Sequence, residues 1–175
     1  GPAMYADDYY MENMLYGSAL RSEYPRAEIL SIDTSEAEKI NGVACVMTAK
    51  DIPGAQKVGH LKRDWDVLIP VGKTTHYLGD AIALIAAETP EILETAKKAV
   101  KVQYKPLQAV FSPEEAMAEN APSVHEDGNL LAYEHLVRGN ADDIISKSKH
   151  KVTYHYSVPF TEHAFMEPEC AVAFP

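Results

Sequence analysis

Short apolar runs recur at three places in the first hundred residues, and each predicts a β-strand. Residues 27–33 (AEILSID), 43–47 (VACVM) and 81–87 (AIALIAA) are bounded by polar or turn-forming residues. The run at 43–47 has no polar position, a pattern typical of a strand that is buried on both faces. Apolar and polar residues alternate again at 102–104, which predicts that the chain returns to a strand there.

Three helix starts lie between or after these runs, and each carries a capping signal. Ser35 with Glu38 forms a capping-box pattern, and the Asn-Gly pair at 41–42 should end that helix. Thr89 precedes a proline that suits the first helical position, and the following apolar residues share one helical face. Ser112 repeats the signal for a third helix that should run to about residue 120.

Two strand–helix–strand passages within about a hundred residues predict an α/β or α+β sheet domain. The sequence Glu-Asp-Gly-Asn at 126–129 is typical of a turn. We therefore place a domain boundary between about 120 and 130, which divides the chain into residues 1–125 and residues 126–175.

The second part has weaker but readable patterns. Residues 129–137 could form a strand, and Asn140 can cap a short helix whose first turn is acidic. Residues 150–158 (HKVTYHYSV) alternate cleanly and predict a strand with one apolar face, and residues 170–174 (CAVAF) predict another. These few elements cannot enclose a core of ordinary size, so we expect this part to be a truncated α+β stub of a second domain.

Charge and cysteine content narrow the class of protein. The formal net charge is −10 and the pI is near 5.1, which argues against binding to nucleic acid or to an anionic membrane surface. Cys45 and Cys170 both lie in apolar runs, so we interpret them as buried free thiols in a reducing, cytoplasmic compartment. No apolar stretch approaches the ~18 residues of a membrane span.

Candidate chemistry is sparse. The sequence has no glycine-rich phosphate loop and no nucleophile elbow. Trp65, in the long polar loop 55–79, is interpreted as an anchor of its own loop. His163 and Glu167 have the spacing of a helical metal pair, but they supply only two ligands and Pro168 would end the helix. We favour a hydrogen-bonded polar network there, with no metal bound in this chain.

The segment Thr161 to Val172 (TEHAFMEPECAV) is similar to the early molybdopterin-binding domain of the xanthine dehydrogenases and aldehyde oxidases. Upstream phrases resemble the family's hammerhead domain in the same order: Thr48-Ala49-Lys50-Asp51-Ile52-Pro53-Gly54, then Tyr77-Leu78-Gly79-Asp80, then Val102-Gln103-Tyr104. These motifs look closest to those of the bacterial selenium-dependent xanthine dehydrogenase branch. The resemblance implies a hammerhead-type mixed sheet with short helices at 1–125 and the start of the molybdopterin-binding domain at 126–175.

The resemblance also implies a function for a larger parent enzyme. That enzyme would be a molybdenum hydroxylase of purine metabolism, an oxidoreductase that hydroxylates a xanthine-like purine, another heterocycle or an aldehyde with oxygen from water. A molybdenum–pterin cofactor would accept the electrons, and iron–sulfur clusters and FAD on other domains or subunits would carry them away. No catalytic residue is expected in this chain, because the family's catalytic glutamate lies beyond residue 175. We expect the 175-residue chain to be inactive alone.

Four residues near the end of the chain are site candidates by resemblance. The family's glutamine before Glu-His aligns with Thr161, so Thr161 is expected to face the cofactor, with Glu162 beside it as a substitute ligand to the same group. His163 and Glu167 are expected to fix the loop behind them through hydrogen bonds. Threonine is shorter than glutamine, so its contact with the metal would run through water or be absent.

Other hypotheses remain open at this stage. The chain could be a non-catalytic packing or assembly module. It could also be a small metal-dependent hydrolase that uses His163 and Glu167, if the fold brings further ligands from His135, His150 and His155 to them. Expected partners are the rest of the molybdopterin domain and the iron–sulfur and FAD components. The uncovered apolar face at 150–158 should also favour a homodimer through residues beyond 130.

Overall fold

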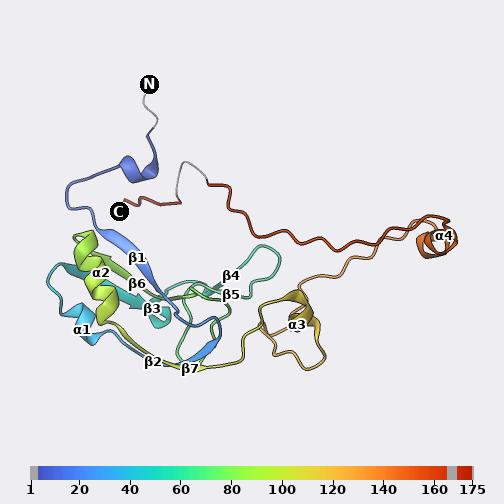
Figure 1. The fold of residues 1–175 in the computed structure, drawn as a ribbon. Coiled ribbons are helices and arrows are strands. Elements are labelled where there is room, and N and C mark those ends of the chain that lie inside the picture. The colour runs from blue at the N-terminus through green and yellow to red at the C-terminus, as the bar shows by residue number, and fades with distance from the viewer. Residues whose placement is uncertain (1–3, 165–168, 175) are drawn as a thin grey trace. The chain divides into compact units, whose positions relative to one another are not determined.

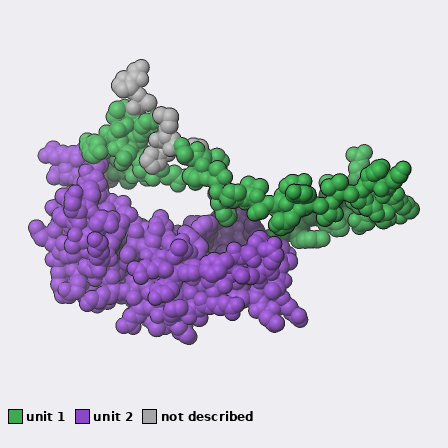
Figure 2. Space-filling view, viewed as in Figure 1, with its two compact units in different colours: residues 1–10, 132–175 green, residues 11–131 purple. Residues whose placement is uncertain are grey.

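The computed structural model describes residues 4–164 and 169–174. They divide into two units, residues 11–131 and residues 1–10 with 132–175, which Figure 2 shows in different colours. The strands of the first unit are β1 (Tyr16–Arg21), β2 (Ala27–Asp33), β3 (Val43–Thr48), β4 (Lys57–Val58), β5 (Trp65–Asp66), β6 (Ala81–Ala87) and β7 (Lys101–Pro106). Its helices are α1 (Ser35–Glu38), η2 (Ala49–Asp51), α2 (Pro90–Ala99) and α3 (Pro113–Met117). The other unit contains η1 (Ala6–Asp8) and α4 (Ala141–Lys147).

Three antiparallel sheets organise residues 11–131. The largest has the order β1-β6-β3, β2 pairs with β7, and the two-residue strands β4 and β5 form a hairpin (Figure 1). Each predicted strand–helix–strand passage links two different sheets, because α1 joins β2 to β3 and α2 joins β6 to β7. The fold class is therefore confirmed in its α+β form, with short helices between antiparallel strands.

The core lies between α2 and the β1-β6-β3 sheet. Leu93 and Ala96 of α2 pack with Ile85 and Ala87 of β6, while Ala37 of α1 completes the cluster. A second cluster joins the sheets: Ile29 of β2, Ile69 of the long loop and Ile82 of β6 are all fully buried. Alternate β6 residues thus serve two clusters, which explains why this strand is apolar throughout.

Side-chain caps form as predicted at the start of two of the three helices expected in this unit. The Thr89 hydroxyl accepts the N–H of Ile92, and the Ser112 hydroxyl accepts the N–H of Glu115. The predicted cap at Ser35 is wrong: Thr34 is the N-cap residue and has no side-chain capping bond, while the Asp33 carboxylate accepts the Ser35 N–H at 3.0 Å. The helix is only four residues long and begins from Thr34, which already has helical backbone angles.

The Asn-Gly pair at 41–42 turns the chain out of α1 as expected. Gly42 has φ +88°, and a Cβ atom there would lie 2.6 Å from Cδ1 of Ile92. The backbone angle therefore favours glycine, and a larger residue would also displace the Ile92 side chain of α2. The third helix ends earlier than expected, at Met117, because the chain leaves helical angles at Ala118.

The expectation of a doubly buried strand at 43–47 is wrong. β3 lies at the edge of its sheet, next to β6 alone, and Ala44 and Cys45 are exposed. Cys170 is exposed as well, so neither cysteine is the buried thiol that the apolar runs suggested. An apolar run shows that a segment suits a strand, but it does not distinguish a central strand from an edge.

Of the four elements predicted from residue 129 onward, one helix is confirmed and three strands are wrong. The Asn140 side chain caps α4 by accepting the N–H of Asp143. The segments 129–137, 150–158 and 170–174 contain no strand in the described part of the chain. A strand needs a hydrogen-bonded neighbour, and none lies beside these segments among the described residues. Of the described helices, none has the length and apolar character that crossing a bilayer requires.

Candidate functional site

The predicted cofactor loop lies on extended and exposed chain. Thr161, Glu162 and His163 have no regular secondary structure, and all three are exposed. The Glu162 carboxylate accepts the backbone N–H of His163 at 2.9 Å, a local bond that turns this side chain back on its own loop. Ala164 then adopts φ +52°, which bends the backbone. Glu167 lies outside the described residues, so its predicted role stays a prediction.

The arrangement of these residues does not by itself build a cofactor site. Thr161 offers one hydroxyl and Glu162 one carboxylate, and the described chain around them forms no enclosing surface. A hydroxyl or a carboxylate can form a hydrogen bond with a ligand of a metal centre. A bound pterin, however, needs contacts that converge from several elements. The described residues therefore do not fit a complete molybdenum–pterin site.

The histidines of the second unit do not gather into a metal centre. His135 packs its ring near Tyr133 at 6.1 Å between centroids, and His150 and His155 are exposed. Across residues 4–164 and 169–174, no three His, Cys, Asp or Glu side chains come close enough together to hold a metal ion. The geometry therefore gives no support to the metal-dependent hydrolase hypothesis.

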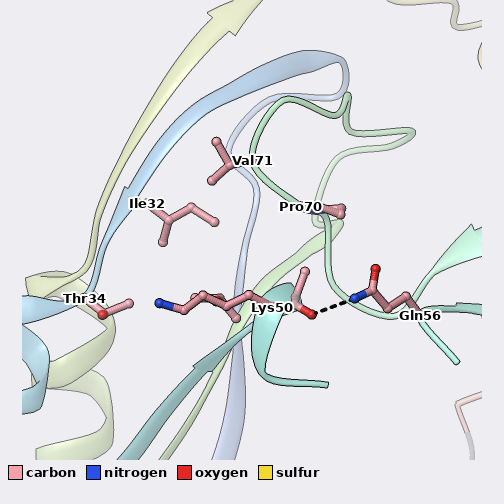
Figure 3. A pocket seen from close by; sticks show the side chains of 8 residues that line it. Ile32, Thr34, Lys50, Gln56, Pro70 and Val71 are labelled. Atoms are coloured by element: carbon pink, nitrogen blue, oxygen red, sulfur yellow. Dashed lines mark hydrogen bonds between the residues drawn. The ribbon is translucent and has the colours of Figure 1, made fainter. Parts of the chain in front are cut away.

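Figure 3 shows a pocket of about 390 Å³ in the first unit, between β2, η2 and the long loop. Its apolar wall comes from Ile32, Pro70 and Val71, while the Lys50 side chain extends across it towards Thr34. The Gln56 amide donates to the Ala49 carbonyl at 3.2 Å and closes one side. One ammonium over an apolar wall could accept an apolar or weakly acidic group, but no nucleophile or acid–base pair lines this pocket.

A buried acid–base pair at the start of β6 was missed by the sequence reasoning. Asp80 is 1% exposed, and its carboxylate accepts the backbone N–H of His76 at 2.9 Å and lies 3.2 Å from Nδ1 of the same residue. The hydrogen bond to Asp80 raises the pKa of His76. The available signal was a histidine four residues before an aspartate that opens a buried strand.

Backbone contacts hold this pair firmly in place. The Asp80 carbonyl accepts the N–H of Ser22 at 2.8 Å, and the Gly79 N–H donates to the Ser22 carbonyl at 3.1 Å. The Arg21 guanidinium donates to the Gly79 carbonyl at 2.9 Å. The end of β1 therefore fixes the start of β6, and with it the position of the buried carboxylate.

Trp65 anchors the long loop 55–79, as predicted. Its ring meets Tyr77 edge to face, with centroids 5.7 Å apart, and about half of the side chain stays exposed. Both aromatic residues belong to the loop 55–79, so the contact closes that loop on itself.

Comparison with known proteins assigns the chain to a family. The family model described as "Aldehyde oxidase and xanthine dehydrogenase, a/b hammerhead domain" matches residues 1–108. The chain is 42% identical over its whole length to a probable xanthine dehydrogenase subunit of Bacillus subtilis, and covers 23% of that protein. It is 36% identical over 99% of its length to the nicotinate dehydrogenase large molybdopterin subunit of Eubacterium barkeri, and covers 40% of that protein.

Solved structures agree with this assignment. The aldehyde oxidoreductase of Desulfovibrio gigas matches 70% of this chain with a TM-score of 0.66 and 29% identity, over 15% of its own length. Quinoline 2-oxidoreductase from Pseudomonas putida 86 matches 83% with a TM-score of 0.70 and 26% identity, over 20% of its own length. The chain spans less than half the length of the relatives described here. It belongs to the aldehyde oxidase and xanthine dehydrogenase family and contains that family's a/b hammerhead domain.

Proposed function

We propose that this chain is the hammerhead domain, residues 1–125, and the opening of the molybdopterin-binding domain, residues 126–175, of a molybdenum hydroxylase. The parent protein would hydroxylate a purine of the xanthine type, with other nitrogen heterocycles and aldehydes as the competing substrate classes. Bound molybdenum–pterin would supply the redox chemistry. The role of the present residues is to shape and support that site, and the chain alone should not turn over.

One observation carries the proposal: similarity to the Bacillus subtilis protein extends over the full 175 residues at 42% identity. The family model ends at residue 108, yet the alignment continues through the exposed segment that holds Thr161 and Glu162. Sequence similarity in a segment whose described residues are almost all exposed supports a role that depends on residues outside this chain. This favours the hydroxylase over a free-standing packing or assembly module.

Thr161 is the residue of this chain that we assign to the cofactor pocket of the parent protein. Its hydroxyl can donate one hydrogen bond and accept others, and it is smaller and less charged than the neighbouring carboxylate. Glu162 would be costly to bury as an unpaired anion, and it already accepts the His163 N–H. We therefore assign Thr161 to face the cofactor, and Glu162, His163 and Glu167 to hold the loop.

The parent enzyme also requires partners. The rest of the molybdopterin domain would cover the exposed apolar side chains after residue 150. Iron–sulfur and FAD domains or subunits would remove the electrons that each turnover releases. These are expectations for the whole protein, and they apply to the present chain only as surfaces that it contributes.

The proposal is tested with the full-length protein. Purified enzyme should contain about one molybdenum per chain by elemental analysis, and should reduce an electron-accepting dye with xanthine or hypoxanthine. Nicotinate and benzaldehyde, tested in parallel, distinguish the substrate classes. Absence of molybdenum, or a fully loaded protein that oxidises none of the four compounds, would refute the proposal.

The assignment of Thr161 is tested separately, with each activity normalised to bound molybdenum. Thr161→Val keeps the shape and removes the hydroxyl, so it should lower turnover about tenfold or more with loading intact, as loss of one positioned polar contact does. Thr161→Ser, the matched control, should retain most of the activity. Glu167→Gln should instead reduce loading. Parental turnover in Thr161→Val would show that this loop is only structural.

A further inference from the structure

The pocket shown in Figure 3 contributes nothing to the function proposed above. Its volume is about 390 Å³, near the lower end of the range of roughly 300–1,000 Å³ that is typical of small-ligand pockets, so it suits a small organic molecule. Three separate segments of the first unit supply its lining: Ile32 and Thr34 at the end of β2, Thr48, Ala49 and Lys50 at η2, and Gln56, Pro70 and Val71 in the long loop.

Backbone hydrogen bonds hold the apolar wall of the pocket in place. The Gly72 N–H donates to the Ile29 carbonyl at 2.7 Å, and the Ile29 N–H donates to the Lys73 carbonyl at 2.9 Å. The Lys73 N–H closes a turn by donating to the Pro70 carbonyl at 3.1 Å. The turn that carries Pro70 and Val71 is therefore fixed against β2 before any ligand binds.

Hydrogen bonds also fix the short helix η2, from which Lys50 extends. The Asp51 carboxylate accepts the Thr48 N–H at 2.8 Å and the Thr48 hydroxyl at 3.1 Å. The Gln56 amide donates to the Ala49 carbonyl and ties the long loop to this helix. Walls that are already ordered lose little conformational entropy when a ligand binds, which favours the binding of a small molecule.

Lys50 is the only charged residue among the eight that line the pocket, and its exposed side chain crosses the pocket towards Thr34 (Figure 3). The neighbouring Asp51 carboxylate is engaged by Thr48. The Glu38 carboxylate accepts the Thr34 hydroxyl. Among residues 4–164 and 169–174, Lys50 takes part in no ion pair. Its ammonium is therefore available to an anionic ligand.

The lining selects a ligand by its charge and by its polarity. The ammonium would repel a cation, and the lining holds no carboxylate to offset that repulsion. A phosphate or sulfate has no apolar part, so it would leave the wall of Ile32, Pro70 and Val71 uncovered. An uncharged hydrocarbon would leave the ammonium without a partner. A carboxylate on a short hydrocarbon body matches both the cation and the wall.

We propose that this pocket binds a small monocarboxylate with a short aliphatic or aromatic body. The carboxylate pairs with the Lys50 ammonium, and the body covers Ile32, Pro70 and Val71, of which Val71 is 55% exposed without a ligand. No bond forms or breaks there, so the pocket is a binding site and not a second catalytic centre. None of its residues belongs to the assigned cofactor pocket, so its occupancy does not depend on the proposed function.

An NMR titration of the 175-residue chain with hexanoate, at fixed pH and ionic strength, tests the site. The methyl resonances of Ile32 and Val71 should shift and saturate, with a dissociation constant on the order of 1 mM, as expected for a small ligand at an open site. Hexan-1-ol keeps the body without the charge and should bind about threefold to fivefold more weakly, the factor that an exposed ion pair supplies. Acetate keeps the charge without the body and should bind about tenfold more weakly or less.

Two variants locate the site. Lys50→Met removes the charge and keeps a side chain of similar length, so it should weaken hexanoate binding about threefold to fivefold and leave hexan-1-ol binding unchanged. Lys98→Met, at an exposed lysine of α2 outside the lining, is the matched control and should bind hexanoate as the parent does. The comparison of hexanoate with hexan-1-ol on the parent chain needs no variant to fold. Shifts that do not saturate, equal affinity of the parent for these two ligands, or parental hexanoate binding in Lys50→Met would each overturn the site.

Discussion

The central strand of the largest sheet offers a direct test of the packing. Ile85 and Leu84 are neighbours on β6 and point to opposite faces, with 1% and 40% of their surface exposed. Ile85 packs in the cluster with Leu93 and Ala96 of α2. Ile85→Ala should therefore lower the free energy of unfolding by about 3 kcal/mol, since its small neighbours Ala37 and Ala87 cannot fill the cavity. Leu84→Ala should cost less than about 1 kcal/mol.

The measurement is urea denaturation followed by circular dichroism, with thermal melting as a second readout. For a unit of this size, about 3 kcal/mol corresponds to a fall in Tm of about 10–15 °C. Leu84→Ala is the matched control, because it removes the same number of carbon atoms one residue away. Equal losses for the two variants would mean that the Leu84 face is covered in solution, and the packing described above would then be wrong.

Three further outcomes are expected. Thr89→Ala should lower the free energy of unfolding of the first unit by about 1 kcal/mol, because it removes the cap of α2. Ser112→Ala should leave the Tm almost unchanged, because α3 buries no residue. Differential scanning calorimetry measures both effects. Limited proteolysis read by mass spectrometry should cut residues 132–164 before any site in 11–131, and early cuts within β6 would contradict the division. Sedimentation velocity should show self-association of the chain, because Val152 and Val158 are exposed. A double variant with Val152→Ser and Val158→Ser should be monomeric. A parent chain that stays monomeric at high concentration would argue against pairing through this segment.

Local signals in the sequence were enough to find most elements of the first unit. The strands at 27–33, 43–47 and 81–87 and the helix after Thr89 are present, because periodicity and capping act over a few residues. β1 was missed. Its sequence YGSALR has weak strand propensity, and it becomes a strand through antiparallel pairing with β6. Whether β3 lies at the centre or the edge of its sheet also depended on pairing, which the run of apolar residues does not encode.

The candidate sites also differ in whether the sequence could reveal them. The cofactor assignment of Thr161 and Glu162 came from resemblance, and no contact within the described chain would have suggested it. The stack of His76 on His125 could not have been found from local patterns, because its two halves come from separate loops brought together by tertiary folding. Asp64 meets His125 only through tertiary folding, whereas Asp80 contacts His76 four residues away in the same loop.

The missing strand at 150–158 shows what an alternating pattern encodes. Val152, Tyr154, Tyr156 and Val158 are 75–91% exposed, yet the rings of Tyr154 and Tyr156 lie 5.5 Å apart on one side of the chain. The alternation therefore still sorts the side chains by face. Among the residues that the structure describes, no neighbouring strand accepts the backbone hydrogen bonds of this segment or buries that face. Such burial is worth about 25 cal/mol per Å² of apolar surface. The relatives described here are more than twice as long as this chain, so we expect the neighbour to come from the rest of the parent protein. In that setting the same residues should form a strand, and Thr161 would be held directly after its end.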